Sequence, residues 1–238
     1  MRSPPVNTTV MPATAASPTE ALPPAVIEYL SALATVEQSK VPGSLEALFA
    51  KAEASQNALM EVTGEQAVLE RLSTEAFAAL QSQVRGLSLH REMDIYAQPL
   101  PAFFLTLAKA HGLPADIAFF EQYAATWGPD LVPVYLKLRP QPTPCVRFGE
   151  DRIAPLYARW QRFAAQHPNA YVEHAAQNLR DLEEAVALGT CACTGVASVL
   201  SEQAAFLKAF PASPKTAEIK ARSLQLVNDP DVLPVNCR

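Results

Sequence analysis

The segment Gly189-Thr-Cys-Ala-Cys-Thr-Gly195 holds two of the four cysteines of this chain, and the other two, Cys145 and Cys237, lie on either side of it. Stretches of helical periodicity precede and follow the segment, so it marks a junction between two helices. What these cysteines can do depends on how the surrounding helices bring them together.

The composition is that of a globular, mainly helical protein. The chain has 238 residues, 49% of them hydrophobic, which is enough for a large core. It has 8 glycines and 21 prolines, which favours helices separated by proline-marked turns. The net charge of -5 argues against a nucleic-acid partner, because a surface that follows a phosphate backbone needs excess Lys and Arg. No apolar run is long enough to predict a transmembrane helix.

Apolar residues recur at helical spacing through most of the chain after residue 22. A capping-box spacing, Thr63-Gly-Glu-Gln66, predicts one helix start, and Asn169 is expected to cap another. The expected helices cover residues 24–39, 45–61, 63–84, 101–111, 114–127, 151–166, 170–188, 193–210 and 214–227.

Two segments have a different period. Residues 86–98 contain alternating apolar positions and predict a short β-hairpin, whereas residues 131–139 suit either a strand or a short helix. No repeat of fixed length is present, which excludes a simple solenoid. The expected fold is therefore an all-α, irregular bundle of about eight or nine amphipathic helices, with a short hairpin and two stapling disulfides.

The domain organisation predicted from composition is a tail followed by one domain. Residues 1–22 are rich in Pro, Ala, Ser and Thr without periodicity, so we expect a disordered tail, with residues 23–238 forming a single helical domain. The first ten residues contain no apolar core of a secretory signal, although a chain that begins after a removed signal would look the same.

Chain direction predicts that all four cysteines lie near one end of the bundle. Short connections make successive helices antiparallel. The expected helix 151–166 and its successor therefore return the chain to the level of Cys145, and the next two helices go away and come back. Cys145, Cys191, Cys193 and Cys237 are thus expected to converge.

Three functions are open for such a cluster. Two disulfides would join Cys191 and Cys193 to Cys145 and Cys237, in either order, and would indicate periplasm or cell exterior. A zinc site is the second alternative, but Cys-x-Cys lacks the usual spacing of structural zinc ligands. Redox catalysis is the third, and it normally uses Cys-x-x-Cys at a helix start. Disulfides are the interpretation we favour, with no metal expected.

The segment from residue 101 to 127 is the most aromatic part of the chain. Core packing is the expected role of its rings, since these residue types are usually buried. The alternative is a ligand pocket lined by Phe103, Phe104, Phe119, Phe120 and Trp127.

Familiar catalytic motifs are missing from the sequence, so no catalytic residue or cofactor is predicted. Glycine-rich nucleotide loops, nucleophile elbows and His-Glu-x-x-His do not occur. The segment His90-Arg-Glu-Met-Asp94 is interpreted as a solvated loop. The polar residues of the expected helix 170–188 are interpreted as a charged surface: Glu173, His174, Asp181, Glu183 and Glu184.

These observations predict a secreted or periplasmic protein that acts by binding another protein. The specific hypothesis is an inhibitor or immunity-type protein that neutralises a basic partner, such as a bacterial toxin or effector, through an acidic surface. The alternatives are a helical enzyme or small-ligand-binding protein with an aromatic pocket, and an envelope scaffold or assembly factor.

Overall fold

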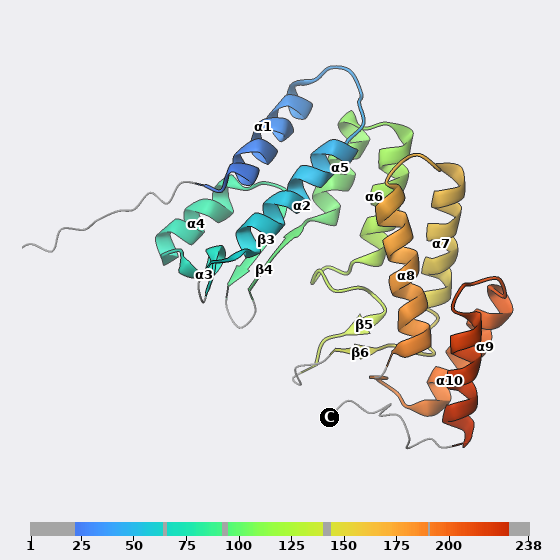
Figure 1. Ribbon diagram of the computed structural model, residues 1–238. Helices are drawn as coiled ribbons and strands as arrows, with labels where there is room; N and C mark the ends of the chain where they lie inside the picture. Colours follow the sequence, from blue (N-terminus) through green and yellow to red (C-terminus); the bar gives the residue numbers. More distant parts are fainter. Residues whose placement is uncertain (1–21, 64–65, 92–94, 140–143, 190, 229–238) are drawn as a thin grey trace, which may run out of the picture.

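The structure is a computed structural model that describes residues 22–63, 66–91, 95–139, 144–189 and 191–228. Figure 1 shows α1 to α5 on one side of the molecule and α7 to α10 on the other, with α6 beside α7. The described helices are α1 (Pro24–Gln38), α2 (Glu46–Met60), α3 (Val68–Arg71), α4 (Thr74–Gln83), α5 (Pro101–His111), α6 (Pro114–Thr126), α7 (Ile153–Gln166), α8 (Val172–Leu188), α9 (Val196–Ala209) and α10 (Thr216–Asn228).

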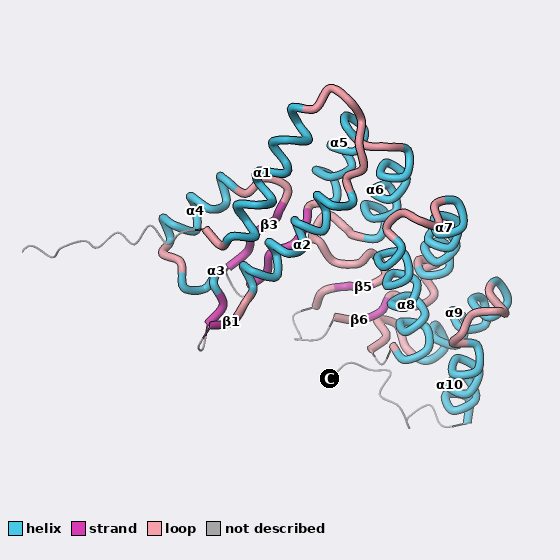
Figure 2. Tube along the Cα trace, turned by 45° about the horizontal axis from the view of Figure 1, so that its top comes forward, coloured by secondary structure: helices cyan, strands magenta, loops and turns pink. Residues whose placement is uncertain are grey.

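The all-α prediction is confirmed for the described part of the chain, although the number of helices is ten there rather than eight or nine. Figure 2 shows that helices form most of the molecule and that the strands are short. The strands form three separate antiparallel pairs: β1 (Val62–Thr63) with β2 (Gln66–Ala67), β3 (Leu87–Arg91) with β4 (Ile95–Pro99), and β5 (Leu136–Lys137) with β6 (Cys145–Val146).

The expected hairpin at residues 86–98 is confirmed as β3 and β4. Leu87, Leu89 and Ala97 are buried, and α2 packs against β4, so the alternating apolar positions face the core. In the other ambiguous segment, residues 131–139, Leu136 and Lys137 form the strand β5, and Pro133 makes an isolated antiparallel bridge with Trp127.

The prediction of one continuous helix over residues 63–84 is wrong, because the helical residues there are divided between α3 and α4, and this division accounts for the additional helix. Thr63 pairs with Gln66 across β1 and β2 instead of capping a helix. Two shorter helices follow, and the Ser73 hydroxyl accepts a hydrogen bond from the Ala76 amide at 3.1 Å to begin α4. A serine that satisfies an orphan amide in this way starts a new helix rather than continuing the old one.

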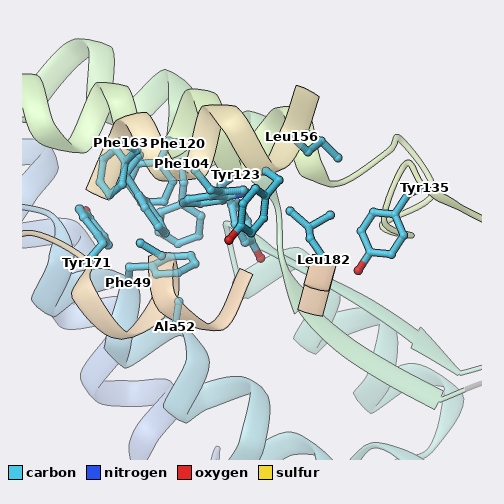
Figure 3. Close-up of a cluster of buried hydrophobic side chains, with 14 of the residues drawn as sticks. Phe49, Ala52, Phe104, Phe120, Tyr123, Tyr135, Leu156, Phe163, Tyr171 and Leu182 are labelled. Carbon is cyan, nitrogen blue, oxygen red and sulfur yellow. The ribbon is translucent and has the colours of Figure 1, made fainter. Parts of the chain in front are cut away.

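Buried apolar side chains from all ten described helices belong to one continuous cluster. At its centre, the Phe49 ring of α2 meets the rings of Phe104 and Phe120 edge-to-face, each with a centroid distance of 5.2 Å (Figure 3). Phe119 stacks on Tyr171 at 3.7 Å, which joins α6 to the start of α8. The predicted tail, residues 1–22, lies almost entirely outside the described residues, so its boundary with the domain stays a prediction.

Candidate functional site

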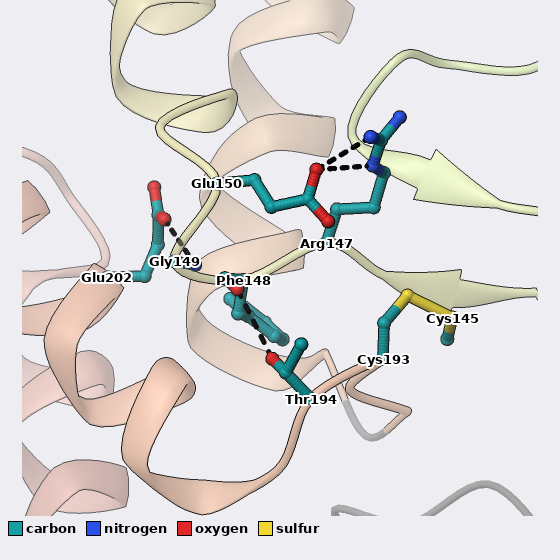
Figure 4. Close-up of polar contacts among 8 residues, drawn as sticks. All are labelled: Cys145, Arg147, Phe148, Gly149, Glu150, Cys193, Thr194 and Glu202. Atoms are coloured by element: carbon teal, nitrogen blue, oxygen red, sulfur yellow. Dashed lines mark hydrogen bonds and ion pairs between the residues drawn. A yellow bond between two sulfur atoms is a disulfide. The ribbon is translucent and has the colours of Figure 1, made fainter.

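The convergence of cysteines is confirmed for the three that the structure describes. Cys145 and Cys193 form a disulfide with an Sγ–Sγ distance of 2.10 Å (Figure 4). Beside it, the Val146 amide donates to the Cys191 carbonyl at 2.7 Å and the Cys193 amide to the Val146 carbonyl at 2.9 Å. A covalent bond and a short parallel bridge therefore fasten β6 to the segment before α9.

One disulfide is found in the described part of the chain, where two were expected for the whole. Its pairing, Cys145 with Cys193, is one of the two orders left open by the sequence. The second expected bond involves Cys237, which lies outside the described residues. Cys191 is not a free thiol.

The polar groups next to the disulfide have structural roles. Glu202 of α9 is only 5% exposed, and its carboxylate accepts a hydrogen bond from the Gly149 amide at 2.9 Å (Figure 4). Burial raises the pKa of Glu202, and the Gly149 hydrogen bond opposes that rise. Thr194 donates to the Phe148 carbonyl at 3.3 Å. The cysteine region is thus a clamp between β6 and α9.

The five aromatic residues proposed as a ligand pocket do not share one environment. Phe104, Phe119 and Phe120 are completely buried and pack around Phe49. Figure 3 shows Phe104 and Phe120 beside Phe49. Phe103 is half-buried with the Arg85 guanidinium over its ring, and Trp127 is half-buried against Tyr123. These contacts match the core-packing expectation, while ligand binding by the five rings stays a prediction.

The described surface is hollowed along the N-terminal half of α8. One depression of about 580 Å³ adjoins an apolar one of about 160 Å³, and Val172 and Ala176 line both. We call the two together the α8 groove. Its lining residues are Glu53, Ala164, His167, Pro168, Ala170, Val172, Glu173, His174, Ala175, Ala176, Gln177, Leu179 and Arg180.

The polar end of the α8 groove is built on an ion pair between two helices. The His174 Nε2 atom lies 2.9 and 2.8 Å from the two carboxylate oxygens of Glu53 on α2. The Glu53 hydrogen bond raises the pKa of His174 against the opposing effect of burial, and the charges of Glu53, Glu46 and Glu173 add to the rise. Glu53 contacts the imidazole directly, and Glu46 and Glu173 add negative charge near it, which makes this end of the groove acidic.

Carboxylates from two other helices hold the start of α8 in place. Tyr171, not Asn169, is the N-cap residue, and it has a left-handed backbone with φ of 50°. Such a conformation is unfavourable for a residue with a Cβ atom. It is stabilised here because the Tyr171 amide donates to Glu46 at 2.8 Å and its hydroxyl donates to Asp116 at 2.6 Å. Burial and the Asp116 hydrogen bond raise the pKa of Tyr171.

The predicted charged surface on α8 is correct for some residues and wrong for others. Glu173, Asp181 and Glu184 are exposed as expected. Glu183 is only 4% exposed and accepts hydrogen bonds from the Tyr157 hydroxyl at 2.5 Å and the Ser213 hydroxyl at 2.9 Å.

The groove could not be located from local sequence signals. The sequence predicts His174 on the exposed face of its helix, and its partner Glu53 lies 121 residues earlier in the chain. Neither residue belongs to a motif.

In the His90–Asp94 segment, His90 stacks on Tyr96 at 5.0 Å, and residues 92–94 lie outside the described part.

Comparisons of the chain with protein-family models, with curated proteins and with solved structures found no match. Among the described residues, no cluster of three or more His, Cys, Asp or Glu side chains could hold a metal ion. In the same part of the chain, no helix has the length and apolar character needed to cross a membrane.

Proposed function

We propose that this protein binds a basic partner protein through the α8 groove in a secreted or periplasmic setting, as an inhibitor or immunity-type protein that neutralises a toxin or effector. The α8 groove is the observation that carries the proposal. It combines an accessible apolar floor with an acidic end on one concave surface.

The apolar part of the groove has the character of an interface centre. Val172 is 53% exposed and lines both depressions. Protein interfaces commonly have a well-packed apolar centre surrounded by polar residues. Because α8 is held by Glu46 and Asp116, its groove is preorganised and a partner does not have to order it.

The charges of the groove favour a basic partner. Glu53 and Glu173 line it, and Glu46 is close enough to influence His174. Arg180 also lines the groove and donates to Gln177 at 2.5 Å, so the acidic character is concentrated toward Glu53. Together with the net charge of -5, this pattern would speed the encounter with a positively charged protein.

The Cys145–Cys193 disulfide supports the proposed compartment. Disulfides persist in the periplasm and outside the cell and are rare in a reducing cytosol. An inhibitor of a secreted or periplasmic effector would meet its target in such a compartment.

The test is affinity capture from secreted and periplasmic fractions of the native host, followed by mass spectrometry. We expect one stoichiometric basic protein to be retained by the wild-type chain. Val172→Gln and Glu173→Lys should each weaken its capture at least tenfold, because a central apolar contact or a charge reversal contributes on the order of 1–3 kcal/mol.

Two matched control variants test whether any loss of binding is specific to the groove or follows from changing the surface elsewhere. Val227→Gln removes a valine that is 64% exposed on α10, and Glu184→Lys reverses an exposed charge on α8 outside the groove. Both should bind like the wild type. Equal binding by all four variants would show that the α8 groove is not the interface, and retention of a small molecule with no protein partner would contradict the proposed function itself.

A further inference from the structure

The α8 groove is divided into two subsites by a ridge on α8. Val172 and Ala176 line both depressions, and residues four apart lie about 40° apart around a helix axis, so together they form this ridge. Ala175 and Leu179 line only the apolar depression, which reaches α7. Glu173, about 100° from Val172 around the axis, lines only the larger depression, which reaches α2. A bound partner therefore meets an apolar side and an acidic side across one ridge.

The apolar subsite has room for one aliphatic side chain. Its volume of about 160 Å³ is several times the space that a water molecule needs. The distance between packed helices depends on the side chains at the contact, and short side chains permit a close approach. Four of the residues lining this subsite are alanines: Ala164, Ala170, Ala175 and Ala176.

The acidic subsite suits a lysine or arginine side chain. Glu173 is exposed and forms no salt bridge with another described residue, whereas Glu53 already pairs with His174. Arg180 lines the same subsite, but its guanidinium donates to Gln177. An exposed ion pair contributes up to about 1 kcal/mol. A cation beside Glu173 would therefore orient the partner, while the apolar contact would supply most of the affinity.

Two adjoining subsites require two neighbouring side chains on the partner. On an α-helix, side chains three or four residues apart are neighbours, and the shallow grooves between such rows accept a ridge of residues four apart on another helix. Val172 and Ala176 form a ridge of this kind. Figure 1 shows α7 and α8 packed side by side, so a third helix lying over the ridge would extend a helical layer that already exists.

Resting on the proposed function, we propose that the partner inserts an amphipathic α-helix into the α8 groove. One aliphatic side chain of that helix enters the apolar depression, and a lysine or arginine three or four residues away pairs with Glu173. Amphipathic helices that lay an apolar face into a groove are a common mode of recognition.

The experiment is selection of peptides from a random phage-displayed library on the intact, oxidised protein near neutral pH. The peptides should have about 16 residues, because shorter isolated helices are marginal in water. Enriched sequences should place Lys or Arg three or four positions from Leu, Ile, Val or Met. An enriched peptide is then synthesised with a fluorescent label, and its Kd is measured by anisotropy.

Groove variants and matched controls locate the peptide. Val172→Gln and Glu173→Lys should each raise its Kd at least tenfold, because the first places a polar amide at the apolar contact and the second replaces attraction by repulsion. Val227→Gln and Glu184→Lys, which lie outside the groove, should leave the Kd unchanged. A proline placed between the two anchor residues of the peptide should abolish binding, since proline breaks a helix interior.

The results that would overturn the helix differ from those that would overturn the proposed function. Absence of enrichment, anchors two positions apart in a peptide that tolerates the proline, or equal binding by all four variants would overturn it. A native partner captured through the groove together with any of these results would leave the proposed function standing. Enriched helical peptides without any captured native partner would contradict the proposed function alone.

Discussion

His174 on α8 and Glu53 on α2 form an ion pair across the two halves of the molecule, with the His174 Nε2 atom 2.8 Å from the Glu53 Oε2 atom. Phe49 and Phe119 pack against the imidazole, at centroid distances of 5.3 and 5.6 Å. The pair therefore lies where the aromatic core reaches the surface at the α8 groove, and it couples the stability of this junction to pH.

The Glu53–His174 pair should make stability depend on pH in a defined direction. The hydrogen bond between His174 and Glu53 raises the pKa of His174 above the ordinary value of about 6.5. The pair stabilises the fold fully at pH values below the pKa of His174 in the unfolded chain. This stabilisation is lost as pH rises through the pKa of His174 in the folded protein. Glu53→Gln should lower the free energy of unfolding by about 1 kcal/mol at pH 5.5 and by less at pH 9, measured by urea denaturation.

Glu184→Gln is the control for this pH dependence, because Glu184 is an exposed carboxylate on the same helix as His174. Its effect should be small at both pH values. An equal loss of stability at pH 5.5 and pH 9 in Glu53→Gln would mean that His174 does not titrate as part of the pair.

The Cys145–Cys193 disulfide should contribute a large part of the stability. The two cysteines are separated by 48 residues. Closing a loop of that size stabilises the fold by about 4 kcal/mol in the chain-entropy model. The double variant Cys145→Ala, Cys193→Ala should therefore unfold at markedly lower denaturant concentration, and an unchanged midpoint would contradict a stabilising role.

The second disulfide remains a prediction of the sequence, now with one pairing. Since Cys145 bonds to Cys193, the expected partner of Cys191 is Cys237. Thiol titration of the denatured, unreduced protein should find no free thiol, and peptide mapping should recover a Cys191–Cys237 linked peptide. Two free thiols in the wild-type protein would remove this second bond from the fold.

Glu202 should respond differently to removal of its charge and removal of its side chain. Burial raises its pKa, so its contribution to stability declines as pH rises from the unfolded value of about 4.3 through the folded value. The side-chain oxygen of the glutamine in Glu202→Gln can still accept the hydrogen bond from the Gly149 amide, and it carries no buried charge. At pH 7 it should be at least as stable as the wild type.

The matched variant Glu202→Ala leaves the Gly149 amide without its partner. It should lose about 1–3 kcal/mol, measured by denaturation at pH 7. The stability of Glu202→Gln should also change less between pH 4 and pH 7 than the stability of the wild type, because the variant has no carboxylate to titrate. A less stable Glu202→Gln at pH 7 would show that the ionised carboxylate is needed.

Gly86 should not tolerate a side chain. Its φ of 81° is in the left-handed region, and an added Cβ would collide with the Tyr29 hydroxyl and come within 2.6 Å of a Phe103 ring carbon. Gly86→Ala should cost about 2 kcal/mol or more. Gly43 has no atom within 4 Å of an added Cβ, so Gly43→Ala should change the thermal midpoint little.

The sequence by itself determined the elements whose signals are local. Helical periodicity with proline at the first turn predicted α1, α5 and α6, and alternation predicted the β3–β4 hairpin. Chain direction also predicted that Cys145, Cys191 and Cys193 converge, because the lengths of helices and loops constrain where their ends lie. These inferences need no knowledge of which side chains touch.

The tertiary structure alone decided the pairing of Cys145 with Cys193, the burial of Glu183 and the meeting of His174 with Glu53. An apolar stripe shows which side of a helix faces the core, but polar residues at the edge of the stripe can be buried or exposed after a small rotation of the helix. That rotation depends on packing between distant elements. The α8 groove could therefore be found only once α2, α7 and α8 were placed together.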